Sequence, residues 1–182
     1  EPSVDLTFVF YAREDVAQEH NGLIELYATR PDLLEGDCAI LGEPTDLGVY
    51  RGQRGRMEAT ITTHGVSAHG AHAERGVNAL YKMAPIISDV EALDGGLADD
   101  EFLGKGSVIV SCIECTTPSL NAVPDSARIF IDRRLTVGET VDSALAELRG
   151  LPHLGDAEVT LRRYEGVSWR GTTVSQDAAF PT

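Results

Sequence analysis

Three histidines lie close together in a segment of small residues. His64, His69 and His72 separate a stretch of alternating apolar and polar residues, 57–62, from a helical pattern that begins near residue 76. The alternation predicts a strand, so the histidines are expected in a strand-to-helix loop. Imidazole can transfer protons, ligate a metal or contact an oxyanion near neutral pH. The other interpretation, a solvated polar loop, stays open on spacing alone.

Acidic residues follow two apolar runs near the start of the chain. Glu14 and Asp15 come after the run at 6–11, and Glu43 comes after the shorter run at 38–41. Continuous apolar runs are typical of strands buried in a parallel sheet. Ligands and catalytic groups collect at the carboxyl ends of such strands, where carboxylates can bind divalent metals. Helix capping and surface turns are the alternative explanation for the same acids.

The net charge restricts the classes of binding partner, and the cysteines indicate the cellular compartment. The net charge of −14 argues against a nucleic acid or an anionic membrane as partner, because both require basic patches. No apolar run approaches the ~18 residues that a membrane span needs. Cys112 and Cys115 stand in an apolar, strand-like run, and we expect them to be buried structural thiols of a cytoplasmic protein.

From residue 52 onward the pattern predicts one complete folded unit. The strands are expected at 57–62, 107–113, 127–135 and 157–164, and the helices at 76–93 and 139–149. The order β-α-β-β-α-β is that of the split ferredoxin-like unit, a four-stranded antiparallel sheet with helices on one face. Such a sheet leaves an edge or a bare face for a partner.

The remainder of the chain predicts only part of a second unit. Residues 1–51 supply two strands and one helix of an α/β sheet, which is too little to bury a core. Residues 166–182 could return to that sheet. We therefore expect an α/β chain in which a partial sheet, 1–51, precedes a ferredoxin-like α+β domain, 52–165.

Several motifs carry a family resemblance. Residues 11–15 (YARED), 21–23 (NGL), 41–46 (LGEPTD) and the loop at 65–79 closely resemble the zinc-dependent amidohydrolase and peptidase family. That family includes acetylornithine deacetylase, succinyl-diaminopimelate desuccinylase, aminoacylase and glutamate carboxypeptidase. Its selenium-metabolism hydrolase branch is the most similar, through the stretches at 49–58, 100–106 and 131–136. The resemblance implies a fragment of a zinc-peptidase catalytic domain, then a complete lid or dimerisation domain, then the start of the return to the catalytic domain.

The resemblance also implies a metal site. Glu14 matches the general base that activates a metal-bridging water, and Asp15 and Glu43 match ligands of two different zinc ions. Cobalt or manganese would be substitutes. Most family members have Glu where this chain has Asp15, which is one methylene shorter. The family's other metal ligands have no counterpart between residues 1 and 182.

The lid domain carries the remaining matched residues. His69 matches the histidine that the lid presents to the reacting carbonyl, across the interface of a homodimer. Asn121 and Arg134 match positions that contact the substrate carboxylate. His64 and His72 have no role in the resembling family.

Taken together, the resemblance implies a di-zinc hydrolase that cleaves an amide bond in N-acyl amino acids, peptides or related carboxylate-bearing substrates. The fragment itself is expected to dimerise without activity. The alternative is a stand-alone ferredoxin-like interaction module without catalysis. A serine hydrolase is disfavoured because the nucleophile elbow needs Gly at the position of His69.

Overall fold

The structure is a computed structural model that describes residues 7, 26, 29–36, 40, 42, 45–167, 171 and 173–182. The strands expected at 6–11 and 38–41 therefore fall almost entirely outside the described residues. The chain divides into two compact units, Glu1–Tyr50 with Arg163–Gln176, and Arg51–Arg162 with Asp177–Thr182. We call the second of these the sheet unit.

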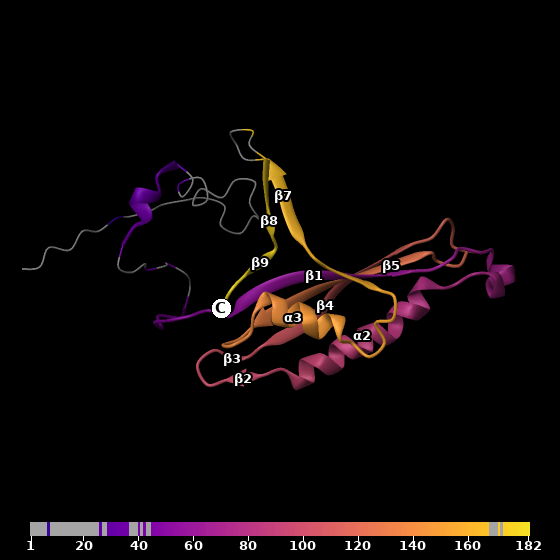
Figure 1. Cartoon of the computed structure of the whole chain (residues 1–182), viewed down its shortest axis with the longest axis horizontal. Helices are drawn as coiled ribbons and strands as arrows, with labels where there is room; N and C mark the ends of the chain where they lie inside the picture. Colours follow the sequence, from indigo (N-terminus) through magenta and orange to yellow (C-terminus); the bar gives the residue numbers. More distant parts are fainter. Residues whose placement is uncertain are drawn as a thin grey trace, which may run out of the picture. The chain divides into compact units, whose positions relative to one another are not determined.

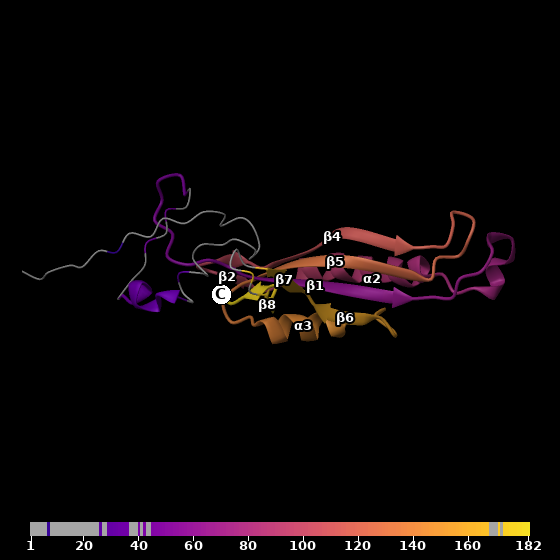
Figure 2. The same cartoon turned by 90° about the horizontal axis from the view of Figure 1, so that it is seen from above.

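The sheet unit is built on a mixed α/β arrangement around one antiparallel sheet. Four of its strands follow the order β4-β5-β1-β6 across the sheet, and each is antiparallel to its neighbours. Figure 2 shows β4, β5 and β1 side by side. Their bounds are β1 Gly55–His64, β4 Ser107–Thr116, β5 Ser126–Leu135 and β6 Glu158–Leu161. One helix follows β1 in the chain and another follows β5, so the chain has the predicted β-α-β-β-α-β order.

Two helices cover one face of this sheet (Figure 1). Helix α2, Ala79–Gly96, begins where the side chain of Asn78 accepts hydrogen bonds from the amides of Leu80 and Tyr81. This cap explains why the helix starts at residue 79 and not at 76 as predicted. Helix α3, Val141–Arg149, begins at a capping box in which Thr140 and Ser143 bond reciprocally.

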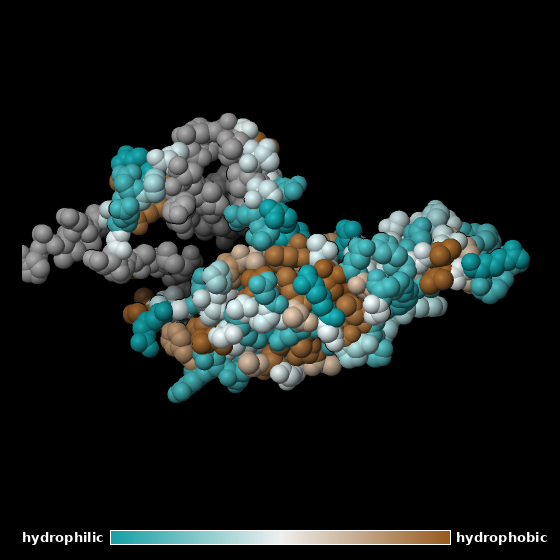
Figure 3. Space-filling model, in the orientation of Figure 1, coloured by the Kyte–Doolittle hydropathy of each residue, from teal (hydrophilic) through white to brown (hydrophobic). Residues whose placement is uncertain are grey.

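The core lies between the helices and the covered face. Met57, Ala59 and Ile61 of β1 are fully buried there, as their alternation in the sequence predicted. Figure 3 shows apolar side chains gathered over α2 and α3. The helices contribute seven buried residues to the core, namely Ala79, Met83, Ile86, Val90, Ala144, Leu145 and Leu148.

Several elements differ from the sequence prediction. The expected linker at 94–106 contains the last turn of α2 and a short hairpin, β2 Asp99–Asp100 with β3 Gly104–Lys105. The expected last strand is divided into β6 and β7, Arg163–Val167, and β7 pairs with β8, Thr173–Asp177.

The end of the chain belongs to the sheet unit. Strand β9, Ala179–Phe180, pairs with the start of β1, so residues 177–182 group with the sheet unit, whereas residues 163–176 group with the first unit. The amide of Glu58 donates to the carbonyl of Ala178, which is buried. This pairing satisfies backbone groups of β1 beyond the end of the short strand β6.

The cysteine prediction is wrong. Cys112 and Cys115 are both exposed because β4 is the outermost strand and its residues 111–116 are exposed throughout. In the first unit, the structure describes the 3-10 helix η1, Pro31–Leu34, besides β7 and most of β8. No helix within the described ranges is long and apolar enough to cross a membrane.

Candidate functional site

Two loops meet beyond one end of the sheet, which we call the histidine end. The loop after β1 contains the 3-10 helix η2, Gly70–Arg75, and the loop between β4 and β5 contains Asn121. The amide of Gly70 donates to the carbonyl of Asn121 at 2.7 Å, and His69 forms an antiparallel bridge with Ala122. The fold therefore brings His69 and Asn121 together although about fifty residues separate them in the sequence.

Small residues are needed where these loops touch. A Cβ atom on Gly65 would lie 2.1 Å from the carbonyl oxygen of Val77, and one on Gly70 would lie 2.8 Å from that of Asn121. Real Cβ atoms do not approach backbone oxygens so closely. Glycine at these positions therefore allows the close backbone contact that places His69.

The local hydrogen bonds fix how His69 presents its ring. Its Nδ1 accepts a hydrogen bond from the amide of Ala71 at 3.1 Å, and the side chain caps η2. A neutral imidazole that accepts at Nδ1 carries its proton on Nε2. Since the side chain is exposed, His69 offers an N–H donor to a group outside its own loop.

The other two loop histidines do not converge with His69. Nε2 of His64 lies 3.9 Å from Glu158, and Nδ1 of His72 lies 3.5 Å from Glu74. In the part of the chain that the structure describes, no three His, Cys, Asp or Glu side chains are grouped to hold a metal ion. The three loop histidines therefore do not form a metal-binding group with other described residues.

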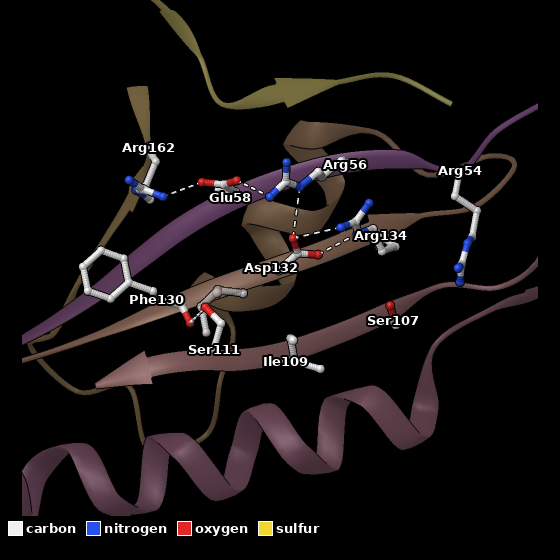
Figure 4. Close-up of a pocket in the computed structure, with 11 residues that line it drawn as sticks. Arg54, Arg56, Glu58, Ser107, Ile109, Ser111, Phe130, Asp132, Arg134 and Arg162 are labelled. Atoms are coloured by element: carbon white, nitrogen blue, oxygen red, sulfur yellow. Dashed lines mark hydrogen bonds and ion pairs between the residues drawn. The ribbon is translucent and has the colours of Figure 1, made fainter. Parts of the chain in front are cut away.

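Arg134 lies near the opposite end of the sheet, which we call the arginine end. It stands on the face that the helices leave open, beside a pocket of about 510 Å³ (Figure 4). The pocket is lined by side chains of β1, β4, β5 and the segments flanking β1 and β6, namely Arg54, Arg56, Glu58, Ser107, Ile109, Ser111, Phe130, Ile131, Asp132, Arg134 and Arg162. Four of these are arginines.

A continuous ion-pair network crosses the pocket. Arg134 donates through Nε to Asp132 at 2.7 Å, and Arg56 donates through Nε to the other oxygen of Asp132 at 3.0 Å. Arg56 and Arg162 both pair with Glu58, and the Arg162 guanidinium lies 5.4 Å from the ring centre of Phe130. The carboxylates thus orient three guanidinium groups before any ligand arrives.

The two ends of the sheet are far apart. Arg134 is the cross-strand partner of Arg56, whereas His64, the last residue of β1, pairs with Ser126. Eight residues of strand at about 3.4 Å each give a separation of about 27 Å. His69 and Asn121 therefore cannot contact the same small ligand as Arg134 within one copy of the chain.

The remaining predicted site residues cannot be placed. Glu14, Asp15 and Glu43 lie outside the described residues, so their roles as base and ligands stay predictions. Sequence reasoning missed Arg54, Arg56 and Arg162 as lining residues. The alternation of Arg54, Arg56 and Glu58 puts them on the polar face of a strand, but only the strand register shows that they meet Asp132 and Arg134.

Comparison with known proteins adds the family. The model of the peptidase dimerisation domain matches residues 51–152, which is more than half of the chain. The chain is 45% identical over 167 residues to the uncharacterized protein YgeY of Escherichia coli K12, covering 91% of this chain and 41% of that protein. It is 34% identical over 143 residues to succinyl-diaminopimelate desuccinylase of Corynebacterium glutamicum, covering 78% and 38%.

A solved structure supports the fold. The amidase of the hydantoinase/carbamoylase family from Burkholderia multivorans superimposes with a TM-score of 0.50 at 17% identity, over 71% of this chain and 28% of that one. Similarity at this level of identity concerns the fold alone. The chain spans about two fifths of the length of the two curated relatives.

Proposed function

This chain belongs to the peptidase dimerisation domain family of the M20 peptidases, and from that premise we propose that it is part of an amide-bond hydrolase. The substrates would be N-acyl amino acids, peptides or related molecules that carry a carboxylate. The family membership supports hydrolase kinship. The substrate class rests on the residues that match the family, above all Arg134.

Arg134 is suited to hold the substrate carboxylate. Its guanidinium presents paired N–H donors that match the two oxygens of a carboxylate. Its side chain is 40% exposed while Asp132 fixes its orientation. A ligand can therefore reach the guanidinium group of Arg134 without changing the orientation of that group.

The separation of the two ends of the sheet is the observation that carries the proposal. His69 offers an Nε2–H donor suited to a developing oxyanion, but its loop follows His64, which lies about 27 Å from Arg134 along the sheet. One substrate can meet both residues only if they come from different subunits. We therefore assign Arg134 to the site of its own subunit and His69, with Asn121, to the site of its partner.

The metal part of the proposal rests on sequence resemblance. Asp15 and Glu43 would each ligate one of two zinc ions, which when bound polarise the amide carbonyl and acidify a water molecule. Glu14 would take the proton from that water. The described residues include no group that could hold zinc, so these assignments concern the other part of the chain.

Complementation between two inactive variants tests the shared site. His69→Ala and Glu14→Gln, each made in the full-length protein, should be nearly inactive when pure, because losing one oxyanion donor typically costs ~10²–10³ in turnover. A 1:1 mixture after subunit exchange should recover about a quarter of wild-type activity, since half the dimers are mixed and one site in each has both intact residues.

His72→Ala is the matched control, because His72 lies in the same loop without a proposed role. This variant should keep near-normal turnover by itself. If mass spectrometry shows subunit exchange and the mixture stays inactive, His69 does not act across the interface.

The second candidate is a dimerisation module without catalysis. The fraction of its relatives that the chain covers, about two fifths, favours this behaviour for the 182 residues alone. Only Asp15 and Glu43 match metal ligands, and zinc sites usually need three or four. The isolated chain should then form dimers that lack both stoichiometric zinc and hydrolase activity. Metal analysis that finds about one zinc per chain after dialysis would contradict this expectation.

A further inference from the structure

The charges at the arginine end are arranged in an unusual way for an ion-pair network. In the register of β1 with β5, Arg56 stands directly opposite Arg134, and Glu58 stands directly opposite Asp132. Like charges in directly opposed positions destabilise a sheet, whereas opposite charges there stabilise it. A network that served only the fold would gain from exchanging Arg56 with Glu58, which would place each arginine opposite a carboxylate.

Positive charge is concentrated among the side chains that line this pocket. Among the pocket side chains, four arginines face two carboxylates, a net charge of +2 in a chain whose net charge is −14. Arg54, one of these four arginines, donates to the carbonyl of Lys105. Ser107, the cross-strand neighbour of Arg134 on β4, adds a hydroxyl to the lining.

The depth of the groups suits an anion that binds from above the sheet. The side chains of Glu58 and Asp132 are 9% and 19% exposed, whereas those of Arg56 and Arg134 are 34% and 40% exposed. The carboxylates therefore form the floor of the pocket, and the guanidinium groups stand closer to solvent. Figure 4 shows Arg56 and Arg134 approaching Asp132 from two directions.

We propose that Arg56 and Arg134 jointly bind one carboxylate group, with Asp132 holding both guanidinium groups in position. The inference takes its ligand class from the proposed function, and it adds Arg56 as a carboxylate-binding residue that the family motifs do not assign. Two adjacent guanidinium groups can each donate to one oxygen of the same carboxylate, a charge-assisted arrangement stronger than a single neutral hydrogen bond. A carboxylate bound there would also relieve the repulsion between the opposed arginines.

Direct binding to the 182-residue chain tests the proposal without any need for catalysis. The probes are N-acetylalanine, its neutral analogue N-acetylalaninamide, and inorganic phosphate, each titrated by NMR at matched ionic strength. N-acetylalanine should bind and the amide should not. Arg56→Gln and Arg134→Gln should each weaken N-acetylalanine binding at least about tenfold, the range expected for losing a hydrogen bond to a charged group.

Arg128→Gln is the matched control. Arg128 lies on the same open face of β5, opposite Thr62, and outside the pocket, so its removal changes the net charge equally. Its binding should stay within about twofold of wild type, because long-range attraction is screened at moderate salt. Arg56→Lys keeps the charge and guards against a folding defect, and urea unfolding verifies the stability of every variant. Arg56→Lys should also bind N-acetylalanine more weakly than wild type, since lysine lacks the planar pair of donors.

The possible outcomes separate this inference from the proposed function. It is overturned if N-acetylalanine does not bind, if the amide binds equally well, if folded Arg56→Gln binds as tightly as wild type, or if phosphate is preferred. Arg56-dependent carboxylate binding by this chain, together with a full-length protein that hydrolyses no amide, would support the site and remove the proposed hydrolysis.

Discussion

Neighbouring arginines in β5 take opposite roles because a strand turns successive side chains to opposite faces. Arg133 is 1% exposed and pairs with Glu139 at 2.5 Å and Glu147 at 3.1 Å, which ties the end of β5 to α3. Arg134 faces the open side and lines the pocket. A shift of one residue in register would bury the ligand-facing arginine and expose the structural one.

Individual glycines likewise set the geometry of the histidine end. Gly65 and Gly76 approach the backbones of Val77 and Val66, so that added Cβ atoms would lie 2.1 and 2.7 Å from carbonyl oxygens. Gly95 in α2 has no atom within 4 Å of the corresponding position. The same substitution should therefore have opposite effects at two glycines of one chain.

We predict that Gly65→Ala destabilises the chain by about 1–3 kcal/mol, because the two segments joined by the Val66–Val77 bridge must move apart. Gly95→Ala should stabilise it by about 0.5–1 kcal/mol, because alanine loses less entropy in a helix. Urea unfolding of both variants measures the difference. Equal stability of the two variants would mean that the loop tolerates a side chain at residue 65.

At the scale of elements, Asp94 joins the last turns of α2 to the start of β4. Its carboxylate accepts the amide of Val108 at 2.9 Å and lies 3.3 Å from the ammonium group of Lys105. The hydrogen bond from Val108, followed by that from Lys105, lowers the pKa of Asp94. One ionised side chain thus adds a direct link between the helix end and the start of β4.

A lowered pKa makes this contact sensitive to acid. The contribution of Asp94 to stability is complete above the pKa it has in the unfolded chain, about 4, and is lost as the pH falls through the lower pKa of the folded state. We predict that Asp94→Asn is less stable than wild type at pH 7, and that this difference shrinks as the pH falls from about 5 to about 2.

Urea unfolding at a series of pH values measures that difference. Glu91→Gln serves as the control, because Glu91 is an exposed residue of the same helix. Its difference from wild type should stay small at every pH. A deficit of Asp94→Asn that is constant with pH would show that the charge of Asp94 does not contribute.

At the scale of the whole molecule, the sheet unit has an edge that no other described strand covers and that is suited to a second copy. Strand β4 is outermost in the sheet, and it exposes Ile109 and Ile113, 54% and 49% respectively. Helix α2 packs next to β4 and exposes Tyr81. A long edge with apolar side chains tends to pair with another chain, and a two-fold homodimer is the commonest way to cover it.

If the chain forms the proposed homodimer through this edge, we predict that Ile113→Lys is monomeric, because it places a charge on the edge that the second copy would cover. Val137→Lys is the matched control, since Val137 is similarly exposed, 52%, but lies in the turn between β5 and α3. Light scattering coupled to gel filtration measures the mass. A dimer that persists in Ile113→Lys would place the interface elsewhere.

The periodicity of the apolar residues was sufficient to predict the order of β1, α2, β4, β5, α3 and β6, but not η2 or the hairpin of β2 and β3. Local rules decide these features, since side-chain period and caps depend on nearby residues. Boundaries were less accurate where a side chain such as Asn78 chose the first turn. The partner of residues 177–182 and the exposure of Cys112 and Cys115 depended on which strands are neighbours, and the sequence pattern does not contain that information.

The sequence by itself determined the family, the order of the main elements of the sheet unit and the identity of His69, Asn121 and Arg134 as candidate residues. Only the tertiary structure decided that His69 and Asn121 lie together, that Arg134 lies at the far end of the sheet, and that Arg56 stands opposite Arg134. The physical reason is that distance along a sheet follows from register and strand order. Contacts between remote segments set both, and no local pattern of residues encodes them.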